Sequence, residues 1–531
     1  MTFDLSIVIK AEFERDKNFI QKKLEEELRK KYSGGDKAEF VFVKKSVDAR
    51  HGQLKLCLRY KAFVGEEPPK AQKEFSWRKA DGSKKVVVVG SGPAGLFAAL
   101  KLLEGGVKPI IIERGKPAPE RKRDIAAIST KGLVDADSNY CFGEGGAGTF
   151  SDGKLYTRSD KRGNISEILQ TFAYFGADPK ILTDAHPHIG TNKLPQIIQN
   201  MRAKIIELGG EFHFESRVVD FIVEERVVRG VAAQTKEGKK EFLADAVILA
   251  TGHSATDIYE LLAKTSAESL EAKTFAVGVR VEHPRELIDK IQYHGKREAA
   301  GLGAAEYRLT AQADGRGVYS FCMCPGGFVV PSATGPNEIV VNGMSAAERN
   351  SAWSNAAIVV ETRPEDIEEM ARAFNFSNNS CRALLGLEFR KWLENKTFLE
   401  ANRTQSAPAQ RLVDFLAGRE SASLPRSSYT PGLVPSRLDR WLPPFIAKRL
   451  KEAFQLFDKN MKGFVCQDAL LIASETRTST PVRILRDKDS LECVGLARLY
   501  PAGEGSGWSG GIVSSAMDGE KSAQKILKKI L

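Results

Sequence analysis

The hydrophobic and polar positions in the N-terminal part of the chain follow strand and helix patterns in turn. Residues 5–10, 40–44 and 54–63 each form a short apolar or alternating run, which predicts three strands. Residues 16–32 are dense in Glu and Lys and predict a helix between the first two strands. We therefore expect a small βαββ domain over residues 1–80.

Composition indicates where that domain ends. Residues 65–83 include the run Gly65-Glu-Glu-Pro-Pro-Lys, and Lys79-Ala-Asp-Gly-Ser-Lys-Lys overlaps their end. Both runs combine charge with Gly or Pro, which interrupt helices and strands alike. The pattern indicates an exposed linker.

The region after the linker alternates strands and helices in the manner of a parallel sheet. Val86 to Val89 is a continuous β-branched run, which is typical of a strand buried on both faces. The further elements expected here are a helix over 93–103, a strand over 109–113, a helix over 193–208, short strands through 211–235 and a strand over 245–250. This succession favours an α/β, Rossmann-like domain.

A long insertion interrupts that domain. From about residue 272 the pattern changes to mixed strands and helices. The helices expected there are 365–374, 383–394 and 445–456. Near residue 495 the chain returns to a strand, a glycine cluster and a final helix over 511–531. We therefore expect a Rossmann-like domain split into residues 84–271 and 491–531, with a mixed α+β cap domain over 272–490.

Composition bounds the possible classes of protein. The chain has 531 residues, which predicts two to four domains rather than one binding module. No run approaches 18 apolar residues, so we expect no membrane span. Seven scattered cysteines without a CxxC pair argue against a disulfide framework and favour a reducing, cytoplasmic environment. The net charge of +11 permits an anionic partner without requiring one.

A glycine-rich turn directly follows the first strand of the Rossmann-like domain. The run Gly90-Ser-Gly92-Pro-Ala-Gly95 opens the next helix, and Glu113 ends the next apolar strand. Gly90 allows a tight turn, Gly92 lets the backbone approach a pyrophosphate, and Gly95 permits close packing of helix on strand. The helix N-terminus faces the anion, and the Glu113 carboxylate can accept both hydroxyl hydrogen bonds of an adenosine ribose. The motif predicts a dinucleotide site.

Three other turns follow strands and are rich in glycine. Residues 143–148 hold four glycines in six positions, Thr251-Gly252 ends a buried strand, and Gly503-Glu504-Gly505 leads into Gly510-Gly511-Ile512. Such backbones are open to a ligand, and the ends of parallel strands are where this type of sheet binds its cofactor.

These motifs resemble the glutathione-reductase-like superfamily of FAD-dependent oxidoreductases. Within it, the chain resembles the bacterial family of uncharacterised FAD-dependent dehydrogenases, through Gly143–Lys154, Phe321–Gly327, Val341–Ser345 and Glu475–Pro481. The resemblance covers nearly the whole chain and implies non-covalently bound FAD. The cofactor contacts that it implies are Gly90, Gly92, Pro93, Ala94, Gly95, Glu113, Arg114, Gly145, Gly146, Ala147, Gly148, Thr149, Ser151, Val219, Thr251, Gly252, Gly503, Glu504, Gly510, Gly511 and Ile512.

The same resemblance implies where each part of FAD lies. The pyrophosphate is expected at Gly90–Gly95, the adenosine ribose at Glu113 and the flavin ring near Gly145–Ser151. The ribityl and pyrimidine ends are expected at Gly503, Glu504 and Gly510–Ile512. The dipole of the last helix would then stabilise negative charge at the flavin N1–C2=O group.

The chain departs from the pyridine-nucleotide disulfide reductases. No second GxGxxG motif follows a strand, so a dedicated NAD(P)H domain is not expected, although NAD(P)H can still serve as a transient reductant. Without a CxxC pair there is no dithiol relay of that type.

Each candidate for substrate contact has a structural alternative; the five candidates are Cys322, Cys324, Asn342, Arg477 and His253. On a regular strand, Cys322 and Cys324 would share one face as a redox-active or substrate-facing pair, but small buried thiols are the favoured interpretation. Asn342 begins an Asn-Gly turn that either lines the active site or is only a turn. Arg477 either clamps a substrate carboxylate or phosphate, or pairs with Glu475 or another acid.

Three histidines are considered for acid–base or metal-binding roles. His253 follows the Thr251-Gly252 turn, where an acid–base role near the flavin is possible but a polar loop residue is more typical. His186 and His188 resemble a metal pair, but no third ligand has a helpful spacing, so no metal is expected.

The sequence therefore predicts an FAD-dependent oxidoreductase that passes a hydride to or from a small-molecule substrate, with no obligatory catalytic acid or base apparent. Three alternatives stay open. One is an alkene reductase on an apolar substrate, similar to geranylgeranyl reductases. A second is an RNA-modifying flavoprotein, for which basic runs such as Lys22-Lys23 and Arg121-Lys-Arg123 would form the nucleic-acid surface, although solvated helix faces explain them better. The third is a non-catalytic FAD-binding scaffold.

Overall fold

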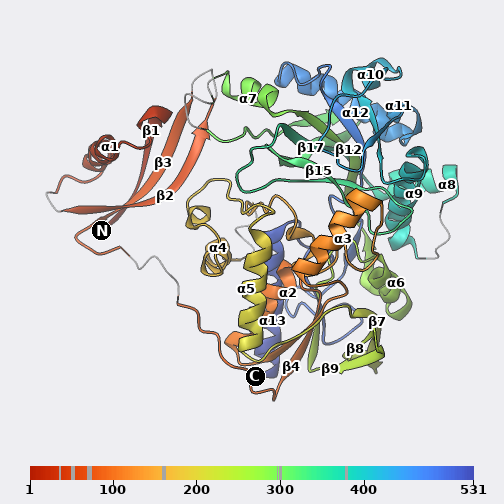
Figure 1. Ribbon diagram of the computed structural model, residues 1–531. Coiled ribbons are helices and arrows are strands. Elements are labelled where there is room, and N and C mark those ends of the chain that lie inside the picture. The colour runs from red at the N-terminus through yellow and green to blue at the C-terminus, as the bar shows by residue number, and fades with distance from the viewer. Residues whose placement is uncertain are drawn as a thin grey trace.

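The computed structural model describes residues 1–34, 37–49, 54–68, 74–157, 163–295, 297, 302–376 and 381–531. Figure 1 shows a small N-terminal unit set beside the rest, a parallel sheet with its helices, and a second layered region above that sheet. The fold class is thus the expected one, an α/β domain split by a mixed α+β region and preceded by a small unit.

The N-terminal unit has the predicted βαββ order. Its elements are β1 (Thr2–Lys10), α1 (Lys17–Arg29), β2 (Ala38–Asp48) and β3 (Lys55–Val64). The strands pair antiparallel in the order β1-β3-β2. Alternate residues of β1, such as Leu5 and Ile7, are buried with Leu24 and Leu28 of α1, whereas the residues between them are exposed. The strand period of two therefore places one face of the sheet on the helix.

The linker is only partly exposed, which corrects the expectation for residues 65–83. Residues 69–73 lie outside the described part of the chain. Beyond them, Trp77 stacks on Phe75 at 4.4 Å and on Phe175 at 5.5 Å between ring centroids. The backbone N–H of Arg78 donates to the carbonyl of Leu103. The buried aromatic surface of Trp77 outweighs the polar character of its neighbours, so this segment is docked on the Rossmann-like domain.

A five-stranded parallel sheet forms the centre of the Rossmann-like domain, in the order β22-β10-β4-β5-β6. Its strands are β4 (Lys85–Val89), β5 (Lys108–Ile112), β6 (Glu211–His213), β10 (Ala246–Leu249) and β22 (Leu499–Pro501). The edge strand β22 comes from the segment after the insertion. Val86, Val87 and Val88 are fully buried, as expected for a strand covered on both faces.

Helices cover one face of this sheet, and a small antiparallel sheet with one further helix covers the other. The helices of the domain are α2 (Pro93–Glu104), α3 (Ala118–Lys131), α4 (Ile165–Tyr174), α5 (Leu194–Glu207), α6 (Thr256–Thr265) and α13 (Ile512–Ile530). Val86 and Val88 pack against α2, α5 and α13. Val87 and Val89 pack against α6 and the sheet of β7 (Arg217–Glu224), β8 (Val227–Thr235) and β9 (Gly238–Leu243).

The inserted region is built on a seven-stranded sheet in the order β13-β14-β17-β12-β20-β18-β19. The strands of this region are β11 (Leu270–Ala272), β12 (Phe275–Pro284), β13 (Thr310–Ala313), β14 (Arg316–Cys324), β15 (Phe328–Pro331), β16 (Val341–Met344), β17 (Trp353–Thr362), β18 (Ala407–Arg411), β19 (Leu433–Pro435), β20 (Leu470–Glu475) and β21 (Val482–Ile484). Its helices are α7 (Arg285–Tyr293), α8 (Pro364–Phe374), α9 (Leu385–Glu400), α10 (Leu412–Ala417), α11 (Leu438–Trp441) and α12 (Pro444–Asn460). Val277 and Val279 of β12 pack on the helix side with Phe454 of α12. Tyr319 and Phe321 of β14 lie on the opposite face.

The first and last helices of the Rossmann-like domain pack closely, as Figure 1 shows for α2 and α13. Gly519 makes this possible, because a Cβ there would lie 2.0 Å from the carbonyl oxygen of Ala94 in α2. The contact joins the segment after the insertion to the segment before it.

We predict that Gly519→Ala forces α13 away from α2 and lowers the free energy of unfolding by about 1–3 kcal/mol, the usual cost of overpacking. Thermal unfolding of the purified protein measures this. Gly303→Ala is the matched control, because a Cβ at Gly303 would meet no atom within 4 Å. Equal unfolding temperatures for the two variants would contradict the packing argument.

Candidate functional site

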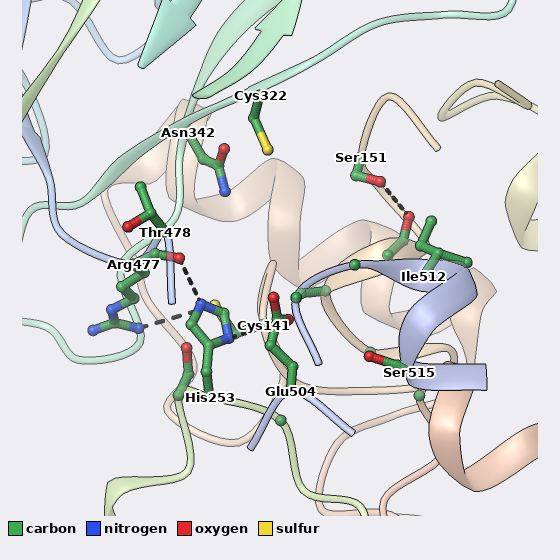
Figure 2. Close-up of a pocket in the computed structure, with 18 of the residues that line it drawn as sticks. Cys141, Ser151, His253, Cys322, Asn342, Arg477, Thr478, Glu504, Ile512 and Ser515 are labelled. Carbon is green, nitrogen blue, oxygen red and sulfur yellow. Dashed lines mark hydrogen bonds and ion pairs between the residues drawn. The ribbon is translucent and has the colours of Figure 1, made fainter. Parts of the chain in front are cut away.

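A cavity of about 870 Å³ lies at the carboxyl ends of the parallel strands. Residues that directly end or follow four of these strands line it, namely Val89, Ile112, Ala250 and Gly503. The cap supplies the opposite wall, including Phe321 of β14. The structure thus brings the separate glycine turns to one space between the two domains, and Figure 2 shows residues from each side of it.

The glycines of the first motif divide into two kinds. A Cβ at Gly90, whose φ is +103°, would lie 2.4 Å from the carbonyl oxygen of Ala250, and a Cβ at Gly95 would lie 2.0 Å from the carbonyl oxygen of Gly90. Both glycines therefore permit close approach of backbone to backbone. A Cβ at Gly92 would meet only the Cα of Gly146, at 3.8 Å. Gly92 leaves space on the cavity side.

Two other cavity glycines also leave space that no protein atom fills. A Cβ at Gly252 or Gly510 would meet no atom within 4 Å, and both residues line the cavity. Bare backbone next to open space is what a ligand requires if it is to contact peptide groups directly. The residues present therefore fit an extended dinucleotide.

Two helices begin at the cavity. Gly92 is the N-cap of α2 and Gly511 is the N-cap of α13, and neither helix has a side chain capping its N-terminus. The first N–H groups of a helix have no partner within it, and the dipole places partial positive charge at this end. Both helix ends therefore favour negatively charged groups in the cavity, such as a pyrophosphate.

Glu113 binds protein donors in this structure. Its side chain is 5% exposed. One carboxylate oxygen accepts from the backbone N–H and hydroxyl of Ser91, at 3.0 and 2.7 Å. The other accepts from the N–H groups of Gly115 and Gly143, at 2.9 and 3.0 Å. Both oxygens are occupied, so the carboxylate joins turns of the cavity wall, and the ribose contact remains a prediction.

Arg121 complements Glu113 with the opposite charge. Its guanidinium is fully buried and donates to the carbonyls of Asn139, Tyr140 and Glu144, at 2.8–2.9 Å. Burial lowers the pKa of Arg121 to about 10. A Cβ at Gly143 would lie 2.4 Å from the Cδ of Arg121, so only glycine fits beside this side chain. In the glycine-rich loop, Glu113 thus accepts from a backbone N–H group and Arg121 donates to backbone carbonyls.

His253 and Glu504 face each other at the cavity wall, as Figure 2 shows. Nε2 of His253 lies 2.7 Å from the carbonyl oxygen of Arg477, which only accepts, so Nε2 carries the proton. Nδ1 lies 3.8 Å from Oε2 of Glu504. Burial, with the nearby Arg390 guanidinium, lowers the pKa of His253 to about 3, so the ring is neutral. Burial raises the pKa of Glu504 to about 7, against the effect of the Lys273 ammonium.

Arg477 lines the cavity and is engaged by structural acids, which is one of its two predicted interpretations. Its guanidinium donates to both carboxylate oxygens of Glu394, at 3.0 and 2.7 Å, and to Glu338 at 3.1 Å. A further N–H donates to the hydroxyl of Thr334. Glu475, the neighbouring acid, instead pairs with Arg280 at 2.9 Å. The partner of Arg477 is therefore Glu394 on α9, and its charge is already compensated.

Cys322 and Cys324 do not form an equivalent pair. The pairing of β14 with β17 shifts register between Phe321 and Cys324, and Cys322 has a φ of +41°. This bulge breaks the alternation that would place both thiols on one face. Both cysteines line the cavity, but Cys322 is exposed and Cys324 is buried. Surrounding protein still desolvates the Cys322 thiol and raises its pKa to about 12.

Asn342 and Gly343 lie within strand β16, which pairs with β15, rather than in a turn. Glycine is required for a different reason, because a Cβ at Gly343 would lie 2.1 Å from Nη1 of Arg280. Asn342 itself lines the cavity, as predicted for one of its two interpretations.

Four of the predicted cofactor contacts do not line the cavity, namely Gly95, Gly145, Thr149 and Val219. Gly95 packs on Gly90, and Thr149 donates its hydroxyl to the carbonyl of Glu144 beside Gly145. Val219 is 38% exposed, and its neighbour Val218 lines the cavity, at a register shift between Val218 and Asp220, so the contact of Val219 with the cofactor stays a prediction. The other predicted contacts, including Pro93, Ala94, Ala147, Ser151 and Thr251, line the cavity. Arg114 does too, with its guanidinium bound by Asp137 and Asp257.

The structure adds wall residues that sequence reasoning missed. They are Ser91, Cys141, Asp152, Lys154, Tyr156, Arg217, Arg308, Gln312 and Tyr319, among others. Ser91, Asp152 and Lys154 stand inside the glycine motifs and could have been named from them. Gln312 and Tyr319 lie in strands of the cap, where no motif marks them. His186 contacts Glu306 and His188 contacts a backbone carbonyl, so the two histidines do not converge.

Comparison with known protein families gives three matches. Two family models, each described as an FAD binding domain, match residues 83–129 and 157–278. A third, described as FAD-dependent protein, C-terminal domain-like, matches residues 274–478. An uncharacterised protein of Clostridium beijerinckii is 38% identical over 541 residues, covering 98% of each chain.

Solved structures show weaker likeness. A geranylgeranyl bacteriochlorophyll reductase-like protein of Thermoplasma acidophilum is 13% identical, with a TM-score of 0.35 over 84% of this chain and 78% of that one. The flavin-dependent brominase Bmp2 is 11% identical, with a TM-score of 0.36 over 84% and 78%. These likenesses are too remote to carry a conclusion about this chain.

The fold, the cavity and the family matches define an FAD-dependent oxidoreductase, and FAD is its cofactor. The chain belongs to the family of uncharacterised FAD-dependent oxidoreductases that includes the Clostridium beijerinckii protein. No helix among the described residues has the length and hydrophobicity to cross a membrane.

We predict that Glu113→Gln weakens both the fold and FAD binding. The amide places N–H groups against N–H donors, and each buried donor that loses its partner costs about 1–3 kcal/mol. Thermal unfolding of the apoprotein and an FAD titration measure the two effects. Glu241→Gln, at an exposed position of β9, is the control. Unchanged unfolding and FAD affinity in Glu113→Gln would rule out the joining role of this carboxylate.

A second prediction concerns Glu504 in the FAD-free protein. Its pKa is raised from 4.5 to about 7, so the folded state holds a proton that the unfolded state releases across this range. The unfolding free energy of the wild type, compared with that of Glu504→Gln, should therefore fall as pH rises from about 5 to 7 and then level off. Denaturant titrations across this range measure it, and Lys273→Met should move the plateau to higher pH. A difference independent of pH would refute the shift.

Proposed function

We propose that this enzyme transfers a hydride between FAD and a small organic molecule bound at the cap end of the cavity, with Glu504 giving or taking the accompanying proton. The continuous cavity carries this proposal. It extends from the glycine turns of the Rossmann-like domain to residues 307, 308, 310–312 and 317–324 of the cap. A substrate at the cap end would therefore share one continuous cavity with a cofactor bound at the glycine turns.

The residues of the cavity wall have separate roles in this proposal. When bound, FAD supplies the ring that accepts or gives a hydride. The N-terminus of α2 holds the pyrophosphate, and that of α13 favours negative charge on the bound group. The glycine turns give backbone contact, and the cap sheet excludes water above them.

Glu504 is suited to move a proton because its pKa lies close to neutrality. It lines the cavity, and its carboxyl faces Nδ1 of His253. The hydrogen bond from Nε2 to the carbonyl of Arg477 fixes the tautomer, so Nδ1 offers a lone pair to Glu504. His253 is thus a positioning residue for the Glu504 proton, and its own low pKa keeps it from competing for that proton.

The cap end of the cavity is of mixed character. Tyr319 and Phe321 lie beside Gln312 and Arg308. This lining favours a small molecule with polar groups over the long apolar substrate of the alkene-reductase alternative. No specific observation favours the non-catalytic scaffold or the RNA-modifying flavoprotein. The experiment below distinguishes the scaffold from an enzyme.

The proposal predicts that holoenzyme purified with FAD is reduced anaerobically by a physiological donor, seen as loss of the flavin absorbance. NADH, NADPH and a metabolite extract are tested separately. The rate of the reaction should depend on a group with a pKa near 7, and Glu504→Gln should remove that dependence and slow turnover by roughly 10²-fold or more. His253→Asn, which keeps a donor for the Arg477 carbonyl, should shift the pH profile with a smaller loss of rate. Flavin that only dithionite reduces would favour the scaffold.

A further inference from the structure

Two uncharged donors point into the cavity from the cap. Figure 2 shows the Cys322 thiol and the Asn342 side chain directed from the cap wall toward the space above Glu504. Both residues line the cavity. They come from different strands, β14 and β16, and meet only in the folded cap.

Arg280 fixes how both groups are presented. Its guanidinium is completely buried behind the wall and pairs with Glu475 at 2.9 Å. Nη2 donates to Oδ1 of Asn342 at 3.2 Å, and the N–H of Gly343 donates to the same oxygen at 2.7 Å. Two donors on Oδ1 set the amide orientation, so Nδ2 is the atom left for the cavity. Among the described residues, none accepts a hydrogen bond from this Nδ2.

The same guanidinium holds the bulge that exposes Cys322. Nη1 donates to the Cys322 carbonyl at 3.3 Å and to Oδ1 of Asn355 at 2.6 Å. The positive φ of Cys322 turns its carbonyl toward Arg280 and its thiol toward the cavity. The thiol keeps its proton at neutral pH, because its pKa is raised to about 12, and it is therefore available as a hydrogen-bond donor.

The charged groups in and behind this part of the wall compensate one another. Arg280 is paired with Glu475, and Arg349 is paired with Asp152 at 2.6 Å and with Glu306 at 2.6 Å. Lys154 lies 3.9 Å from Asp152. Three cations thus meet three carboxylates, so the ion pairs around the two neutral donors carry no net charge, and Lys154, Asp152 and Glu306 line the cavity beside them. Arg308, farther along the wall, is exposed to solvent.

We infer that Asn342 Nδ2 and the Cys322 thiol form a subsite for the oxygen of a neutral carbonyl group, so that the substrate is an uncharged carbonyl compound rather than a carboxylate or a hydrocarbon. Arg280 is the positioning residue of this subsite. The inference rests on the proposed function, because it names the substrate class for the same cavity. A neutral acceptor satisfies both donors without adding a charge that the compensated wall would leave unpaired.

The test uses three probes of similar size that differ in the group offered to the subsite. Acetophenone, ethylbenzene and benzoate are titrated separately into oxidised holoenzyme, and the flavin difference spectrum reports binding. Acetophenone should bind tightest. Equal binding of acetophenone and ethylbenzene would overturn the inference, and so would tighter binding of benzoate, which would assign recognition to a cation of the wall, Lys154 or Arg308.

Variants then separate the two donors. Asn342→Ala should weaken acetophenone binding by roughly 2- to 10-fold, as expected for one lost neutral hydrogen bond, without changing ethylbenzene binding. Asn342→Asp, which turns an oxygen toward the carbonyl, should weaken it further. Cys322→Ala should weaken it and Cys322→Ser should restore it. Asn337→Ala, at an exposed position outside the cavity wall, is the control. Unchanged affinity in both Asn342 variants would overturn the subsite.

A second measurement does not require bound FAD, so it still gives a result for a variant that has lost the cofactor. In the apoprotein, acetophenone should slow the modification of Cys322 by methyl methanethiosulfonate, measured by peptide mass spectrometry, and Asn342→Ala should reduce that protection. If the flavin is reducible but the probes show no preference, the inference fails and the proposed function stands. If no donor reduces the flavin while acetophenone still binds through Asn342, the proposed function fails and the subsite stands.

Discussion

Tight glycine turns leave backbone N–H and C=O groups without partners in a helix or sheet, and the cavity wall of this protein is made largely of such turns. Buried in the wall, each unpartnered group would cost about 1–3 kcal/mol. The Glu113 carboxylate meets this demand for the donors of Ser91, Gly115 and Gly143, and the Arg121 guanidinium meets it for three carbonyls of the same loop. One buried acid and one buried base therefore hold the turns in the arrangement that a dinucleotide requires.

In this arrangement, some residues maintain the shape of the cavity wall and others border the space that a ligand would fill. Gly90 and Gly95 serve contacts within the protein, whereas Gly92, Gly252 and Gly510 face open space. The same division appears in the cap, where Arg280 is buried behind the wall and Asn342 and Cys322 reach the cavity. Several of the charged groups at the wall pair with one another, and the neutral side chains of Asn342 and Cys322 line the cavity beside them.

Local patterns made much of the Rossmann-like domain predictable. The apolar run of β4, the glycine turn after it and the start of α2 are adjacent in sequence, so their pattern and their structure coincide. The bulges at Cys322 and Val219 could not be foreseen, because they depend on which strand lies alongside. Arg477 pairs with Glu394, 83 positions away, and Trp77 packs on Phe175. The sequence around Arg477 or Trp77 does not indicate such distant partners.

The position of β22 and α13 has a consequence for how the protein is made. Both elements follow the cap in sequence, yet β22 forms the sheet edge beside β10, and α13 packs on α2. During synthesis, the cap with its own core emerges and folds while the side of β10 still lacks its neighbour. Loading of FAD is thus a late event that waits for the ribosome to finish this segment, and until then the open strand is a point where nascent chains can mispair.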